Sequence, residues 1–194
     1  FTGLVDFYHR MASTKISNVW TLEPFASFTI GEDIGSTSMT SLVRVRNQVI
    51  SNGPIQVYGD GVEKYGNWIV KNANERILIK SSARIWNNTN ADFTTNLGDI
   101  TLWSNSDNAS TGDNAGNIYL NNQVDFNTFN GVAAATTPNY TSPWGSLTAT
   151  TGGDITLGGG LASTADANRP AGGAYSGNSA DMAVRLGTSC DSII

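Results

Sequence analysis

Residue types that build redox and nucleophilic sites are scarce in this sequence of 194 residues. It has one cysteine, Cys190, which excludes an intrachain disulfide, and one histidine, His9, on which any Ser–His–Asp or Cys–His site would depend. No motif places His9 beside a nucleophile. We therefore interpret His9 as a surface or capping residue and Cys190 as an incidental thiol, an intermolecular link or reactive thiol being the alternative for Cys190.

The sequence also has few charged residues and no long apolar runs. Charged residues make up 14% of the chain and the net charge is −5, which provides no positive surface for nucleic acid. No apolar run is long enough to span a bilayer. Abundant Asn, Ser and Thr disfavour helix interiors, whereas the regular return of Ile, Val, Leu and aromatic residues argues against disorder. We expect an all-β protein that neither binds nucleic acid nor inserts into a membrane.

One five-residue motif, GDITL, occurs twice in identical form, at 98–102 and at 153–157. Looser copies begin at Gly53, Glu75 and Gly116, and each copy places apolar residues two positions apart after a turn residue. The anchoring isoleucines, separated by 22, 23, 18 and 37 residues, are Ile55, Ile77, Ile100, Ile118 and Ile155. We interpret the last spacing as about two units. A strand motif that returns about every 20 residues is typical of a solenoid, whose single turns are too small to bury a core.

The repeat length separates a solenoid from other all-β folds. Sandwiches and barrels also join strands by short turns, but their strands share no motif, and these copies recur at the length of a coil. We therefore predict a right-handed parallel β-helix with protruding loops. The five isoleucines should stack in one column, with Ile100 between Ile77 and Ile118. Asn at equivalent turns should form side-chain ladders between coils.

The chain divides into an irregular start and a regular body. Residues 1–40 are predicted to form N-terminal strands that cap the solenoid or connect it to a preceding repeat, and residues 41–194 to form the β-helix itself. The predicted strands of the body are 41–46, 55–58, 68–70, 77–80, 84–86, 100–103, 118–121, 124–129, 146–149, 155–158 and 183–186. The predicted loops are 104–115, 130–145 and 159–181. Residues 192–194 read as the start of another coil, so we expect neighbouring repeats of a longer parent chain as partners.

Six short stretches carry a resemblance to a known family. They are 21–25 (TLEPF), 53–59 (GPIQVYG), 98–104 (GDITLWS), 116–120 (GNIYL), 152–160 (GGDITLGGG) and 183–187 (AVRLG). Together they resemble the repeat regions of large filamentous-haemagglutinin-type surface adhesins, most of all the giant repetitive adhesins of gliding Bacteroidota exported by the type IX secretion system. The likeness covers residues 19–59 and 97–194. The Asn-Pro-Asn-Gly-type signature of two-partner secretion does not occur.

The resemblance implies a non-enzymatic, secreted segment displayed on the bacterial cell surface. Its work would be adhesion, as part of gliding motility or cell attachment, with a stiff rod that presents loops to a surface, a glycan or a partner cell. Proteins of the secretion machinery are further implied partners.

Parallel β-helices also include polysaccharide lyases and glycosidases, which can work with a pair of carboxylates. Asp99 and Asp154 are the obvious pair by motif. Each directly precedes its isoleucine, however, where an aspartate accepts turn hydrogen bonds. We therefore predict no enzymatic activity. A β-helical polysaccharide-degrading enzyme remains the main alternative, and a phage or other structural fibre is a third possibility.

Aromatic residues are predicted on the outer face of the strands. The expected register places five residues in one outward column: Tyr58, Lys80, Trp103, Asn121 and Gly158. Tyr119 points outward from the neighbouring column. Exposed aromatic rings stack on sugar rings, so Tyr58, Trp103 and Tyr119 are the candidate ligand-binding residues. The competing interpretation is that loops 104–115 and 130–145 fold back and cover them.

No cofactor is predicted, although calcium is a candidate ligand. Asp107, Asp113 and Asp166 lie in loops rich in Asn and Gly, and oxygen atoms of this kind suit calcium. Against it, the nonapeptide of calcium-binding β-rolls does not occur.

Overall fold

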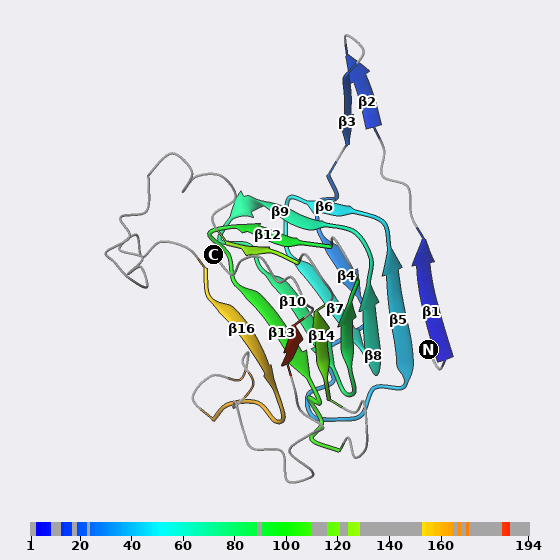
Figure 1. Cartoon of the computed structure of the whole chain (residues 1–194), viewed down its shortest axis with the longest axis vertical. Coiled ribbons are helices and arrows are strands. Elements are labelled where there is room, and N and C mark those ends of the chain that lie inside the picture. The colour runs from blue at the N-terminus through cyan, green and yellow to red at the C-terminus, as the bar shows by residue number, and fades with distance from the viewer. Residues whose placement is uncertain are drawn as a thin grey trace, which may run out of the picture.

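The computed structural model describes residues 3–8, 13–16, 19–22, 24–88, 91–109, 116–120, 124–128, 153–164, 167, 170 and 184–186. In 3–8, 13–16, 19–22 and 184–186 it describes the backbone alone. Every regular element within these residues is a β-strand (Figure 1). No helix in this part of the chain is long and apolar enough to cross a membrane.

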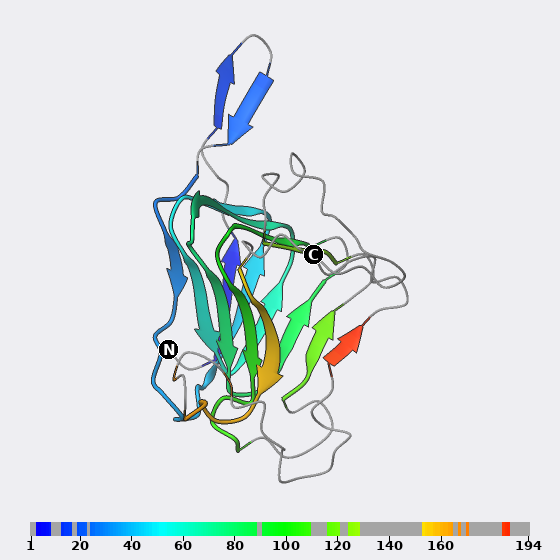
Figure 2. The same cartoon turned by 90° about the vertical axis from the view of Figure 1, so that its left-hand side faces the viewer.

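The strands form three parallel sheets. Sheet I contains β4 (Phe28–Ile30), β7 (Ile55–Gly59), β10 (Ile77–Ser81), β13 (Ile100–Ser104) and β16 (Ile155–Gly159). Sheet II contains β1 (Gly3–Tyr8), β5 (Ser41–Arg46), β8 (Gly61–Lys64), β11 (Ile85–Asn87), β14 (Ile118–Leu120) and β17 (Val184–Leu186). Sheet III contains β6 (Val49–Ser51), β9 (Trp68–Ala73), β12 (Phe93–Asn96) and β15 (Phe126–Asn127). The chain visits the sheets in the order I, II, III, which confirms the predicted parallel β-helix (Figures 1 and 2).

The solenoid starts earlier than predicted. β1 pairs in parallel with β5, and β4 with β7, so strands before residue 41 already belong to the sheets. The exception is an antiparallel hairpin of β2 (Ser13–Ile16) and β3 (Val19–Leu22), which projects beyond the solenoid (Figures 1 and 2). The division expected at residue 40 therefore does not separate an irregular start from the regular coils.

Four of the five predicted anchors share one column. Ile55, Ile77, Ile100 and Ile155 are direct partners on neighbouring strands of sheet I. The fifth prediction is wrong, because Ile118 pairs with Ile85 in sheet II. Its 18-residue spacing from Ile100 leads around a corner from one sheet to the next. The 37-residue spacing from Ile118 to Ile155 is likewise not two coils. It runs from β14 in sheet II to β16 in sheet I, and because β16 pairs directly with β13 it covers less than one coil.

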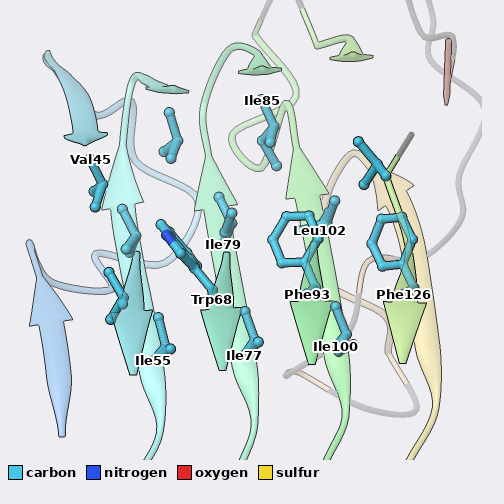
Figure 3. Close-up of a cluster of buried hydrophobic side chains, with 14 of the residues drawn as sticks. Val45, Ile55, Trp68, Ile77, Ile79, Ile85, Phe93, Ile100, Leu102 and Phe126 are labelled. Carbon is cyan, nitrogen blue, oxygen red and sulfur yellow. The ribbon is translucent and has the colours of Figure 1, made fainter. Parts of the chain in front are cut away.

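Side chains from all three sheets meet in one core (Figure 3). Sheet III contributes an aromatic column in which the ring centroids of Trp68 and Phe93 lie 6.1 Å apart and those of Phe93 and Phe126 lie 5.0 Å apart. Ile77 and Ile100 of sheet I are also fully buried. Burying one such side chain contributes about 1.5–3 kcal/mol, so contacts between successive coils supply most of the stability.

Polar side chains at the corners connect successive coils. Asn67 Oδ1 accepts the backbone N–H of Asp92 at 3.0 Å, and Asp92 Oδ1 accepts that of Asp125 at 3.0 Å. Asp99 Oδ1 accepts the N–H of Asp154 at 2.8 Å. Side chains at the corners therefore link successive coils, but through side-chain-to-backbone bonds in which two of these three acceptors are aspartate, whereas the prediction was a ladder of asparagine side chains. Asp99 has the hydrogen-bonding role predicted for it.

Most predicted strands lie where the structure places them, within one to three residues at either end. The predicted strand 124–129 is shorter, at Phe126–Asn127. The predicted strand 146–149 and loop 130–145 lie outside the described residues, as do His9 and Cys190.

Long insertions occur at the corner between sheets I and II. This corner is tight between β7 and β8 and between β10 and β11. By contrast, residues 31–40 follow β4 and residues 105–117 follow β13. We call residues 31–40 the strap, because they cross the outer face of sheet I.

Candidate functional site

The outer face of sheet I carries the predicted outward column. Tyr58, Lys80, Trp103 and Gly158 are direct partners on β7, β10, β13 and β16. They alternate with the core residues of the same strands and therefore face away from the core. Asn121, the remaining predicted member, lies outside the described residues, and β14 before it belongs to sheet II.

The strap buries Tyr58. The backbone N–H of Met39 donates to Ser82 Oγ at 2.9 Å, and Met39 forms a small apolar cluster with Tyr58 and Leu78. Tyr58 keeps 8% of its surface exposed. Burial, with a smaller contribution from the negative charge of Asp33, raises the pKa of its phenol.

Two polar contacts hold the strap against later coils. Asp33 Oδ1 lies 2.6 Å from Lys80 Nζ on β10, and the Lys80 side chain is almost fully buried. Ser38 Oγ donates to Asp107 Oδ2 at 2.5 Å in the segment that follows β13. The strap therefore spans several coils, although it leaves the solenoid after β4.

Trp103 is covered as well, with 2% of its surface exposed. Its indole Nε1 donates to the carbonyl oxygen of Gly160 at 2.6 Å, and Lys80 Nζ lies 4.4 Å from the ring centroid. The predicted exposure of Tyr58 and Trp103 is therefore wrong. Among the described residues, the strap covers Tyr58 and the residues after β16 contact Trp103, whereas loop 130–145 and residues 110–115 lie outside the described residues.

Tyr119, the third predicted residue, lies on the outer face of sheet II. Its ring stacks on that of Trp86, with centroids 5.2 Å apart and planes at 27°. Trp86 is 36% exposed, and the Arg84 guanidinium lies 5.7 Å from its centroid. One face of the Tyr119 ring is thus occupied by Trp86. Sequence reasoning predicted a strand at 84–86, but it assigned outward-facing residues only from the copies of the GDITL motif, which do not include Trp86.

A groove of about 640 Å³ opens over β10 and β13, between the strap and the residues after β16. Its lining includes Asp33, Ser36, Lys80, Trp103, Ser106 and Leu161. Leu161 is 46% exposed and forms an apolar wall. Ser106 is 1% exposed, and its Oγ has no hydrogen-bond partner among the described residues. Buried hydroxyls are normally paired, so this hydroxyl is available to a ligand or a water molecule.

The described carboxylates considered for catalysis and calcium do not line the groove. Asp99 and Asp154 precede β13 and β16 at the corner entering sheet I, and neither lines the groove. Asp107 accepts hydrogen bonds from Ser38 Oγ and from the N–H of Ala109, at 3.1 Å for the latter. Asp113 and Asp166 lie outside the described residues, within which no group of three His, Cys, Asp or Glu side chains could hold a metal ion. Calcium binding stays a prediction.

The groove is suited to binding a polar ligand with apolar faces. Asp33 is the one acidic side chain among the described residues of its lining, and it is paired with Lys80. The hydroxyls of Ser36 and Ser106 offer further hydrogen bonds beside the Leu161 wall. Searches of family models, curated proteins and solved structures gave no match to this chain.

Proposed function

We propose that this chain is a non-enzymatic segment of a secreted, repetitive bacterial cell-surface adhesin. It forms a stiff rod and presents loops and a groove for attachment to a surface, a glycan or another cell. The six stretches that resemble gliding-type adhesins exported by the type IX system support the proposal. Neighbouring repeats of the same parent chain and proteins of the secretion machinery are the proposed partners.

The arrangement of insertions is the observation that carries this proposal. Tight corners between β7 and β8 and between β10 and β11 keep the coils regular. The strap and the segment after β13 add chain outside the core, at the same corner. Loops placed outside a stacked core can vary without disturbing it, which suits a protein whose binding surface changes while its rod stays constant.

A glycan is the ligand class that fits the groove best. Sugar rings carry hydroxyl groups at their edges and apolar C–H faces, and the groove pairs serine hydroxyls and charged groups with an apolar wall. The volume of about 640 Å³ is of the size found in ligand sites. No glycan stacking on Tyr58 or Trp103 is proposed, because both rings are buried.

We expect Ser106→Ala to weaken glycan binding roughly 2- to 10-fold, the equivalent of one hydrogen bond of about 0.5–1.5 kcal/mol. A panel of neutral and acidic oligosaccharides, followed by calorimetry on the ligand that binds, would measure this. Trp86→Ala is the matched control, since Trp86 lies on sheet II and should leave binding unchanged. If Trp86→Ala abolishes binding and Ser106→Ala has no effect, the Trp86–Tyr119 pair is the binding surface.

We expect no hydrolase or lyase activity on acidic or neutral polysaccharides. Asp99 serves the ladder between coils, and Asp33 is paired with Lys80. Reducing-end and unsaturated-product assays would check this. Turnover that Asp99→Asn or Asp154→Asn abolishes would favour the alternative, a polysaccharide-degrading enzyme.

A further inference from the structure

A lysine side chain lies inside the core. Lys64 ends β8 and occupies an inward position of sheet II between Val45 and Asn87 on the neighbouring strands. The residue has no exposed surface. Its Nζ donates to the carbonyl oxygens of Ala91 and Asp92 at 2.5 and 3.0 Å. Lysine is rarely buried, so this position is unusual for a solenoid core.

The surroundings of Lys64 favour the uncharged amine. Nζ lies 4.0 Å from the ring centroid of Phe93 and 5.6 Å from that of Trp68. Burial holds the pKa of the amine well below its ordinary value, and the negative charge of Asp92 offsets part of this effect. A neutral amine with a free electron pair is a nucleophile.

The partner of Lys64 across the sheet is a buried carboxamide. Asn87 has no exposed surface, and its Nδ2 donates to the carbonyl oxygen of Ala91 at 2.9 Å. The same oxygen accepts the hydrogen bond from Lys64 Nζ. Asn87 Oδ1 has no hydrogen-bond partner in the part of the chain that the structure describes. An amine and an amide are thus held at one oxygen, on adjacent strands about 4.8 Å apart.

We propose that Lys64 and Asn87 form a covalent cross-link, an amide bond between Lys64 Nζ and Asn87 Cγ that joins two successive coils. Nζ attacks Cγ, the Nζ–Cγ bond forms and the Cγ–Nδ2 bond breaks. The leaving nitrogen takes one proton from Nζ and departs as ammonia. One amide replaces another, so the step needs no oxidant, reductant or added reactant.

The fold supplies two features that favour this reaction, proximity of the two groups and exclusion of water. Pairing in sheet II holds the two groups side by side, which makes the reaction intramolecular. Aromatic side chains enclose the site and limit the access of water, which would compete for the carboxamide. The unfolded chain has neither feature, so the bond should form only after folding.

Mass spectrometry of the intact, denatured chain tests the proposal. We expect the wild-type protein to be lighter than its sequence by one ammonia and Lys64→Met to show no such loss. Lys71→Met, at an exposed lysine of β9, is the matched control and should keep the loss. A branched peptide containing Lys64 and Asn87, obtained with trypsin and chymotrypsin, separates this bond from a cyclic imide at another asparagine. A folded wild-type protein of full mass overturns the proposal.

Two further measurements do not depend on the first. Asn87→Asp should lose water instead of ammonia if the bond forms, and Asn87→Ala should lose nothing.

The dependence of stability on pH gives the second measurement. A free Lys64 amine binds its proton more weakly in the folded chain than in the unfolded chain, whose pKa is the ordinary 10.5. Wild-type stability would then rise relative to Lys64→Met as the pH increases toward 10.5. An amide does not titrate, so we expect a constant difference, and a rising one contradicts the cross-link.

Discussion

Replacing Ile100 with aspartate should lower the free energy of unfolding by more than about 4 kcal/mol, enough to unfold most of the chain. Ile100 is fully buried on β13 of sheet I, between Ile77 and Ile155 on the two neighbouring strands. The substitution removes the burial of an isoleucine, about 1.5–3 kcal/mol, and adds a carboxylate with no partner in the core. Urea unfolding followed by circular dichroism would measure the loss.

Thr29→Asp is the matched control for this change. Thr29 lies on β4 of the same sheet, and its side chain is exposed. The same charge placed there should change stability by less than about 0.5 kcal/mol. Equal effects of the two substitutions would show that the isoleucine column does not hold the coils together.

Gly98→Ala should cause a second large loss, about 3 kcal/mol, at the upper end of the range for overpacking. A Cβ atom at Gly98 would lie 1.9 Å from the carbonyl oxygen of Glu75 in the preceding coil. Gly153, the equivalent residue of the next coil, would meet the oxygen of Gly98 at 2.1 Å. Backbone atoms cannot move aside as flexible side chains do, so the two coils would have to separate. Thermal and urea unfolding would report the change.

Gly35→Ala serves as the comparison. Gly35 has a φ of +71° but no atom within 4 Å of an added Cβ, so only the backbone conformation opposes alanine. We expect a loss of about 1 kcal/mol there. If Gly35→Ala is the more damaging of the two, close approach between coils is not the reason for the repeated glycine of the GDITL motif.

The solenoid could be predicted because its core imposes a pattern on the sequence. Inward positions such as Ile77 and Ile100 must be apolar in every coil, and they recur at the length of one coil. Ile118 was misplaced because the chain passes through three sheets in each coil. Where the corner between two sheets is long, the chain reaches the next sheet after about as many residues as a short coil contains. The two cases then look alike in the sequence.

The groove and the core lysine could not be predicted in the same way. Strand alternation correctly placed Tyr58 and Trp103 on the outer face, but their exposure depends on what lies over that face. The strap contains no periodic pattern that would show where it packs. Lys64 and Asn87 each occupy the inward position that comes after an apolar inward residue on the same strand. Sequence alone assigns polar residues of this kind to the surface.

The strap also affects how the solenoid responds to a pulling force. Tension along a solenoid separates its coils one at a time, because each coil contacts only its neighbours. Here the coil that contains β4 is tied to β10 by Asp33 and Lys80 and to the segment after β13 by Ser38 and Asp107. The load on this coil therefore passes directly to coils further along, which makes the strap a mechanical clamp across these coils of the solenoid.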